Sequence, residues 1–423
     1  MKKNFLHICL ICILCVLSLT GCRTDSFSRT PSTLSIDEEY PQGGFILHSG
    51  SPMVETPEGF YAFQDNYLYY ITSDLTKSTI LCGKPECTHN VNPSTNLYEA
   101  AECNAFFVRP QISYYEGYLY IAAQNIAVQN ITAQNFQTET DDISTVVYQV
   151  SLDGSEKKIF FDVGQFINGM CIYKGDMYIA DAVYTETGKK DRIRKISMKD
   201  PSDVKTLFET TDYPSSTLNR FECYGDFCYF FFTPGEEDGV YRYLRINLQT
   251  GEITTLHESS DDTSLLYMND YGCIIEDQDV NRKNQYDDWL WDSTYYKIAP
   301  GDTNTVPLTE QDFPLLAETP KLENIDDTYI YLSSMHHSSW SEKSWPEDAS
   351  IYVCTYDGEI AATIPLGREF SGSVFHALPG TEGYLFVYSQ KYAEGVAETR
   401  YYYAPKAEFG DGAVVQLKEI PME

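Results

Sequence analysis

Three cysteines and one histidine lie close together in the first third of the chain: Cys82, Cys87, His89 and Cys103. Thiolate sulfur and imidazole nitrogen are the ligands that zinc takes in tetrahedral structural sites. Gly83 and Pro85 allow a tight return that would bring Cys82 and Cys87 together. The C-x4-C-x-H spacing with a later cysteine is compatible with zinc, although it lies outside the best-defined finger spacings. The segment therefore indicates either a zinc site or a disulfide.

A disulfide is the alternative for the same segment. Two of its three cysteines would pair, and His89 would be a hydrogen-bonded surface residue. The third thiol would then need a partner elsewhere among the remaining cysteines: Cys171, Cys223, Cys228, Cys273 and Cys354. Under either interpretation these residues cross-link a connector, 83–110, that has few apolar side chains with which to form a core of its own.

A second cysteine pair flanks a short turn. Cys223 and Cys228 enclose Tyr224-Gly225-Asp226-Phe227, so a two-residue turn at Gly225-Asp226 would place the two cysteines opposite each other. A cross-strand disulfide is one expectation, provided that the pair is the closer, non-hydrogen-bonded kind. Two buried free thiols are the other, because free cysteine packs as a small hydrophobe.

The N-terminus carries an export signal. Lys2 and Lys3 precede an apolar run that is too short to span a bilayer comfortably, and small residues follow it. Residues 1–21 therefore read as a signal peptide. The sequence Leu19-Thr20-Gly21-Cys22 resembles the lipobox of bacterial lipoproteins, and this resemblance implies that Cys22 is acylated, as with palmitate, and becomes the new N-terminus. Residues 22–43, rich in Ser, Thr, Pro and Asp, are expected to form a flexible tether.

The charge of the chain restricts its partners. The formal net charge is −32, and such a surface repels polyanions, which argues against nucleic acid. It would also be repelled by an anionic leaflet, so the N-terminal lipid is left as the membrane contact. We expect a protein anchored in the cell membrane and facing the extracytoplasmic side.

A repeating unit fills the rest of the chain. Each copy has a strand, a tight turn, an aromatic strand, a variable insert and two further short strands. Four short strands at this period are typical of propeller blades, which must stack because one unit cannot bury both faces of its sheet. The prediction is an all-β fold, a β-propeller over 44–423 with seven four-stranded blades: 44–82, 111–161, 167–208, 218–256, 264–309, 321–366 and 374–417. A pair of β-sandwiches or a solenoid is the alternative.

The lipobox, the Cys82 to Cys103 segment and the Tyr-rich repeats together resemble uncharacterised lipoproteins of Gram-positive gut anaerobes. Those proteins are described as propeller-like, through similarity to the YWTD propellers of low-density-lipoprotein receptors. Leu68-Tyr69-Tyr70-Ile71 is only an approximate match to YWTD. The resemblance implies a fold and a location but no reaction.

The function is less constrained than the fold. Tryptophans and histidines occur in the inserts of the fifth and sixth units, where they form a candidate ligand face: Trp289, Trp291, Trp340, Trp345, His336 and His337. Loop aromatics of this kind bind ligands, sugars included, although rings that pack as local cores are the alternative. No motif of a hydrolase, zinc protease or nucleotide-binding enzyme is present. These observations favour a non-catalytic module that binds an extracellular ligand, such as a glycan, or an envelope protein. A glycan- or cell-wall-active enzyme using the same face and a structural envelope-assembly component are the alternatives.

Overall fold

The fold is described from a computed structural model. The structure describes residues 52–422, apart from short gaps at 90–99, 101, 126–143, 165, 186–187, 212–216, 234–238, 261–262, 270–271, 284–288, 300–301, 311–313, 319–320, 335–344, 381 and 394–395. The predicted signal peptide, Cys22 and the predicted tether lie outside the described residues. None of the described helices is long and apolar enough to cross a bilayer.

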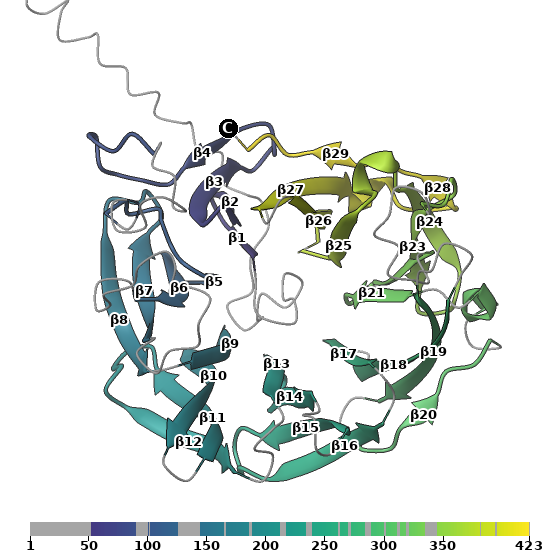
Figure 1. Ribbon diagram of the computed structural model, residues 1–423, viewed down its shortest axis with the longest axis horizontal. Coiled ribbons are helices and arrows are strands. Elements are labelled where there is room, and N and C mark those ends of the chain that lie inside the picture. The colour runs from purple at the N-terminus through teal and green to yellow at the C-terminus, as the bar shows by residue number, and fades with distance from the viewer. Residues whose placement is uncertain are drawn as a thin grey trace, which may run out of the picture.

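Seven antiparallel sheets of consecutive strands stand around a ring (Figure 1). The first blade contains β1 (Met53–Thr56), β2 (Gly59–Gln64), β3 (Tyr67–Thr72) and β4 (Ser78–Ile80). The second contains β5 (Gln111–Tyr115), β6 (Tyr118–Gln124), β7 (Thr145–Ser151) and β8 (Lys157–Gly164). The third contains β9 (Phe166–Tyr173), β10 (Asp176–Thr185), β11 (Gly188–Ser197) and β12 (Val204–Thr210). The fourth contains β13 (Thr217–Tyr224), β14 (Phe227–Thr233), β15 (Tyr241–Asn247) and β16 (Ile253–Ser259).

The remaining blades continue the ring in chain order. The fifth contains β17 (Thr263–Asn269), β18 (Gly272–Lys283), β19 (Trp289–Ile298) and β20 (Val306–Pro307). The sixth contains β21 (Lys321–Ile325), β22 (Tyr329–Ser333), β23 (Ser350–Thr355) and β24 (Ile360–Pro365). The seventh contains β25 (Ser373–Leu378), β26 (Tyr384–Ala393), β27 (Val396–Pro405) and β29 (Lys418–Glu419). The predicted seven-bladed propeller is confirmed.

The first two strands of several blades are joined by tight turns that the sequence dictates. Glu116-Gly117 and Lys174-Gly175 both have positive φ at the two central positions, as hairpin turns that match the strand twist require. Aromatic and β-branched residues fill the strands on either side of these turns. Each hairpin therefore forms locally, and the neighbouring blades then bury its two faces.

The apolar core is divided among the seven seams between blades. The seam between blades 1 and 2 holds Tyr61, Phe106 and Leu119, and the seam between blades 7 and 1 holds Phe60 and Phe386. The five other seams have clusters of the same kind. Stacking against two neighbours is what makes each thin sheet stable, as expected for a circular repeat.

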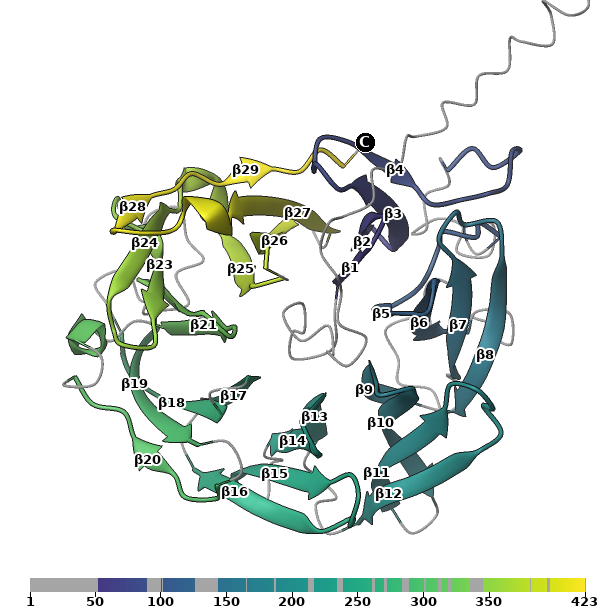
Figure 2. The same ribbon diagram turned by 180° about the vertical axis from the view of Figure 1, so that it is seen from behind.

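The C-terminal segment departs from the simple repeat. β28 (Ala413–Val414) pairs in parallel with β24 of blade 6 and makes that sheet five-stranded. The chain then crosses to blade 7, where β29 pairs with β27. Seen from behind, in Figure 2, this segment runs along the outside of the ring, and the C-terminus lies near β4 of blade 1. Blade 1 contains only strands from the N-terminal part of the ring, and blade 7 only strands from the C-terminal part, so no sheet combines the two ends. Ile420, close to the C-terminus, packs in the core between these two blades.

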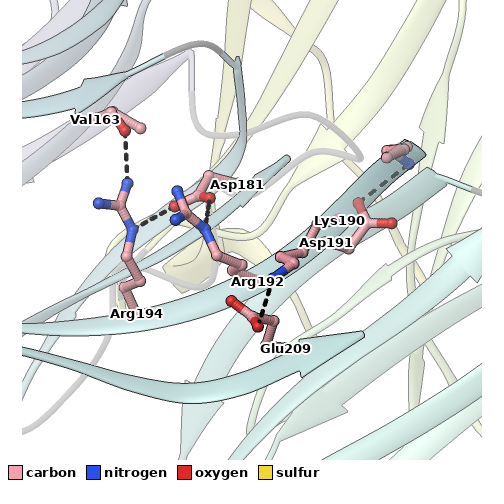
Figure 3. Close-up of polar contacts among 8 residues, drawn as sticks. Val163, Asp181, Lys190, Asp191, Arg192, Arg194 and Glu209 are labelled. Carbon is pink, nitrogen blue, oxygen red and sulfur yellow. Dashed lines mark hydrogen bonds and ion pairs between the residues drawn. The ribbon is translucent and has the colours of Figure 1, made fainter. Parts of the chain in front are cut away.

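A buried ionic network joins blades 2 and 3 (Figure 3). Asp181 on β10 is 1% exposed, and its two oxygens accept bonds of 2.7 Å from Arg192 Nε and 2.5 Å from Arg194 Nε. The same Arg194 donates from Nη2 to the carbonyl oxygen of Val163, at the end of β8, at 2.7 Å. Burial raises the pKa of Asp181, against the opposing effect of the two guanidinium groups. The carboxylate thus orients two arginines, one of which reaches across to the preceding blade.

Candidate metal centre

The four residues of the cysteine-histidine segment converge. The ligand atoms of Cys82, Cys87, His89 and Cys103 all lie within 4.8 Å of one another. In a tetrahedral zinc site with Zn–S bonds of about 2.3 Å, neighbouring sulfurs lie ~3.8 Å apart. The cluster therefore needs only a small contraction to surround one ion. Cys103 is buried and the other three residues are half-buried.

The connector after β4 is held in place from both sides. The Leu81 N–H donates to the Leu68 carbonyl of β3 at 2.8 Å, which extends the outer edge of blade 1. The next contact is with blade 2, where the Gly83 N–H donates to the carbonyl of Gly154 at 3.1 Å. A Cβ at Gly83 would lie 2.6 Å from Cα of Ser155, so the close approach requires glycine. Cys82 is thereby fixed between two blades.

The other ligands sit on short local turns. The Cys87 N–H donates to the Lys84 carbonyl at 3.1 Å, and the Cys103 N–H donates to the Ala100 carbonyl at 3.0 Å. His89 has a φ of +54°, an unusual conformation for a residue other than glycine. Such backbone strain persists only where the surroundings over-determine the conformation.

After Cys103 the chain returns to the ring and locks the seam between blades 1 and 2. Asn104 Nδ2 donates to the Gly154 carbonyl at 3.2 Å, and the Phe107 N–H donates to the Asn66 carbonyl at 2.9 Å. Phe106 forms an isolated β-bridge with Tyr67 and packs edge-on against its ring. In Figure 1 the loop after β4 reaches outward at the rim of the ring, away from the central opening. The cluster is thus a rim feature that ties two blades together.

The ionisation of the thiols differs across the cluster. Burial raises the pKa of Cys82, but hydrogen bonds from the His89 side chain and from the backbone at Lys84 and Asn104 outweigh burial and lower it to about 6. Burial raises the pKa of Cys103 to about 12, and the neighbouring Cys82 contributes in the same direction. Without metal, Cys82 is therefore the thiolate at neutral pH and Cys103 keeps its proton.

Two lysines place positive charge beside the sulfurs. Lys157, at the start of β8, donates from Nζ to the Phe106 carbonyl at 2.9 Å and lies 3.9 Å from the centre of the Phe107 ring. Burial lowers the pKa of Lys157 to about 8, although the negative charge of nearby Cys103 and Cys82 acts in the other direction and raises it. Lys84 donates to the Glu102 carbonyl. Three thiolates around a divalent ion would leave one net negative charge, and the positive charges of these two ammonium groups would stabilise it.

The residues fit zinc. Among the described residues, His89 Nε2 is a buried atom with no hydrogen-bond partner, so this imidazole nitrogen is placed to serve as a ligand. Three thiols and one imidazole make up a Cys₃His set, which is a standard composition of closed structural sites. With four protein ligands no coordination position is left for a substrate. The chemistry that this arrangement supports is cross-linking of the chain rather than catalysis.

The second predicted pair also lies as the sequence indicates. Cys223 on β13 is directly opposite Cys228 on β14, and both residues are buried. The structure adds Cys171 of blade 3, whose side chain hydrogen-bonds with Cys223. Sequence spacing gave no signal for this third thiol, because it belongs to another blade.

The candidate ligand face is only partly described. Trp289 and Trp291 belong to strand β19, which extends the β18–β19 hairpin, instead of to a loop. Trp345 is 8% exposed and packs in the core between blades 6 and 7, as in the alternative interpretation of these rings. His336, His337 and Trp340 lie outside the described residues.

The sequence carries no sign that Lys157 lies beside the cysteine-histidine cluster. Three strands of blade 2, β5 to β7, separate this lysine from Cys103 in the chain, and the lysine follows a tight turn at Asp153-Gly154 that is common to several blades. Only the packing of blade 2 against the connector brings its ammonium group to the thiols.

Comparison with known proteins adds little to this picture. No protein-family model matches the chain, and no curated protein matches it. Among solved structures, it is similar to a prolyl endopeptidase at 10% identity, with 90% of this chain and 51% of the other covered and a TM-score of 0.46. An oligogalacturonate lyase in complex with manganese is similar at 8% identity, with 68% and 74% covered and a TM-score of 0.41. The β-propeller domain of the Trilobed protease from Pyrococcus furiosus is similar at 10% identity, with 75% and 97% covered and a TM-score of 0.34. The chain spans about half the length of the prolyl endopeptidase, and similarity at this level assigns no activity to it.

Proposed function

We propose that this protein is a lipid-anchored extracytoplasmic β-propeller that binds an extracellular partner, and that a structural zinc ion closes the seam between its first two blades. The observation that carries the zinc proposal is the convergence of three sulfurs and one imidazole nitrogen within 4.8 Å. Zinc, when bound, supplies a tetrahedral cross-link. The chain supplies the positioned ligands and the neighbouring Lys157.

The zinc proposal is tested by elemental analysis of the purified full chain. We expect one zinc per chain, and loss of that zinc in Cys87→Ser and Cys103→Ser. Cys354→Ser is the matched control, because Cys354 is a buried thiol in the core between blades 5 and 6 and should leave the zinc content unchanged. A metal-free wild type with a disulfide between two of the segment's cysteines would overturn the proposal.

The location rests on the N-terminal sequence. Cleavage before Cys22 and acylation of its thiol would leave the propeller on a tether outside the membrane. Metabolic labelling with a palmitate analogue should mark the wild type, and Cys22→Ala should lose both the label and the membrane fraction. Labelling that persists in Cys22→Ala would contradict this assignment.

The binding role rests on the aromatic inserts of blades 5 and 6. We infer that the extended β18–β19 hairpin, with Trp289 and Trp291, and the insert with Trp340, His336 and His337 form the ligand face. Trp345 is excluded from it because its ring packs in the core.

A screen against glycan arrays and envelope proteins tests the binding role. Combined replacement of Trp289, Trp291 and Trp340 by Ala should abolish the binding that the wild type shows, whereas Trp345→Phe should retain it in a folded protein. Turnover of a polysaccharide would instead identify an enzyme that acts on glycans or cell-wall material. Stable co-purification with envelope proteins, without any small ligand, would indicate an assembly component.

A further inference from the structure

Three cysteines from two neighbouring blades meet in one buried core. Cys171 lies on β9 of blade 3, and Cys223 and Cys228 lie on β13 and β14 of blade 4. All three belong to the apolar cluster between these blades, where Cys171 is 3% exposed and the other two are fully buried. The three sulfurs are thus shielded together from solvent.

Cys223 is the neighbour that the other two share. The Cys223–Cys228 pair follows the Tyr224–Phe227 pair that closes a two-residue turn, so it occupies a non-hydrogen-bonded position of the ladder. At such positions the Cα atoms lie about 4.5 Å apart, within the range that a disulfide spans. Cys223 also contacts Cys171 in the same cluster, through its side chain and through its backbone N–H, which donates to the Cys171 sulfur. Cys223 therefore has one potential partner within its own hairpin and another in the preceding blade.

We propose that Cys171, Cys223 and Cys228 form a disulfide-exchange set in which Cys223 bonds either to Cys228 within the hairpin or to Cys171 across the blade seam. Formation of the first bond rests on the proposed extracytoplasmic location, because disulfides form and persist outside the reducing cytoplasm. That Cys223 has two alternative partners rests on the geometry of the core and does not depend on the location.

The chemistry is balanced at each step. In the first, before the core between blades 3 and 4 closes over them, Cys223 and Cys228 lose two electrons and two protons to an external disulfide, such as oxidised glutathione, which is reduced to two thiols. Burial holds the pKa of Cys171 well above its ordinary value, so the attacking species is its small thiolate fraction. In the second step Cys171 loses its proton and attacks the sulfur of Cys223, the Cys171–Cys223 bond forms, and Cys228 leaves as a thiolate and takes up that proton. This exchange involves no net oxidation.

The two bonds have different consequences for the ring. The bond to Cys228 closes a short loop in a hairpin that the sheet already holds. The bond to Cys171 closes a much longer loop and joins the innermost strands of blades 3 and 4, so in the chain-entropy model it restricts the unfolded chain more. Exchange therefore changes how firmly the two blades are joined.

Trypsin separates the two outcomes without any label. Cleavage after Lys158 and Lys174 places Cys171 alone in peptide 159–174, and cleavage after Arg220 and Arg242 places Cys223 and Cys228 together in peptide 221–242. A Cys171–Cys223 bond links the two peptides. A Cys223–Cys228 bond leaves peptide 221–242 single, with its mass lower by two hydrogen atoms.

The experiment maps the full chain after refolding in the presence of oxidised glutathione and rapid alkylation. We expect one disulfide in this set in the wild type. Cys171→Ala should leave only the bond within peptide 221–242, Cys228→Ala only the linked peptides, and Cys223→Ala neither. Cys354→Ala is the control, and should match the wild type. The proposal is overturned by absence of both bonds in the wild type, by failure of either single variant to form its remaining bond while folded, or by a Cys171–Cys228 bond in Cys223→Ala.

Location and pairing are separated by a second measurement. Protein taken directly from membranes is alkylated before lysis and mapped in the same way. Free thiols there, together with a disulfide of this set after oxidation in vitro, would contradict the location and leave the exchange set intact. Absence of both bonds in vitro would overturn the exchange set whatever the location.

Discussion

The hydroxyl of Tyr401, on β27, donates a buried hydrogen bond of 2.7 Å to the carbonyl oxygen of Phe63, on β2. The two residues belong to the last and the first blades. Because neither blade borrows a strand from the other end of the chain, this bond and the surrounding apolar contacts of Phe60, Phe386 and Ile420 close the ring. The closing seam therefore depends on side chains.

Removing that hydroxyl should weaken the ring at this seam. Tyr401→Phe leaves the Phe63 carbonyl without this donor, at a cost of about 1–2 kcal/mol in the free energy of unfolding. Chemical denaturation monitored by intrinsic fluorescence would measure the change. Tyr403→Phe, two residues along the same strand, is the control and should change the midpoint little. Equal effects of the two variants would show that the seam bond has no special role.

Breaking the network of Asp181 should be more damaging than breaking a surface pair. Asp181→Ala leaves two arginines without their buried carboxylate, and we expect a loss of about 3–4 kcal/mol in unfolding free energy. Glu209→Ala removes the 2.9 Å pair with Lys190, whose side chains are 43% and 33% exposed, and should cost less than about 1 kcal/mol. Urea titrations of both variants against wild type give the comparison. Similar losses in the two would contradict the structural role of Asp181.

Glu276 should make stability depend on pH. Burial raises its pKa to about 6, although Ser293 and Tyr295 donate hydrogen bonds to Oε1 at 2.8 and 3.0 Å. The pKa of Glu276 is higher in the folded protein than in the unfolded chain, so the protonated carboxyl favours folding. The contribution of Glu276 to the free energy of unfolding is therefore fully present below about pH 4.5 and is lost as the pH rises through about 6. Glu276→Gln removes this loss, so above pH 6 it should be more stable than wild type by about 2 kcal/mol. The exposed Glu258→Gln is the control, and thermal melts from pH 4 to 8 would measure both; a pH-independent difference would refute the assignment to Glu276.

Removal of the proposed zinc should reveal one reactive thiol. After chelation, Cys82 is half-buried and its pKa is lowered to about 6, so it should react with iodoacetamide faster than Cys103, whose pKa is raised to about 12. The rate should fall by half near pH 6 and should be suppressed when zinc is restored. Peptide mapping after brief alkylation measures the ratio. Equal labelling of Cys82 and Cys103 at pH 7 would contradict the charge distribution described for this cluster.

Much of the fold follows from local sequence signals. Turns such as Lys174-Gly175 force a hairpin, and their recurrence at a blade-sized period predicts seven units whose bounds agree with the sheets within a few residues for blades 2 to 6. The C-terminal segment was not predictable in this way. β28 and β29 have two residues each, and their pairing with two different blades depends on the completed ring.

The candidate site divides along the same line. Convergence of Cys82, Cys87 and His89 follows from a tight turn within one segment. The approach of Lys157 to these thiols and of Cys171 to Cys223 depends on how neighbouring blades stack, and linear spacing carries no record of it. Burial of Trp345 is likewise decided by the seam between blades 6 and 7.

The strap formed by β28 and β29 has a consequence for biosynthesis. The outermost strand of blade 7 is supplied by Lys418 and Glu419, so the seventh sheet stays incomplete until the ribosome has passed residue 419. Six blades can assemble in order as the chain emerges, but the seventh sheet gains its outermost strand, and Ile420 reaches the seam with blade 1, only after the last residues have left the ribosome. A chain threaded through a membrane channel would keep its first and last blades apart throughout transit and join them only after release.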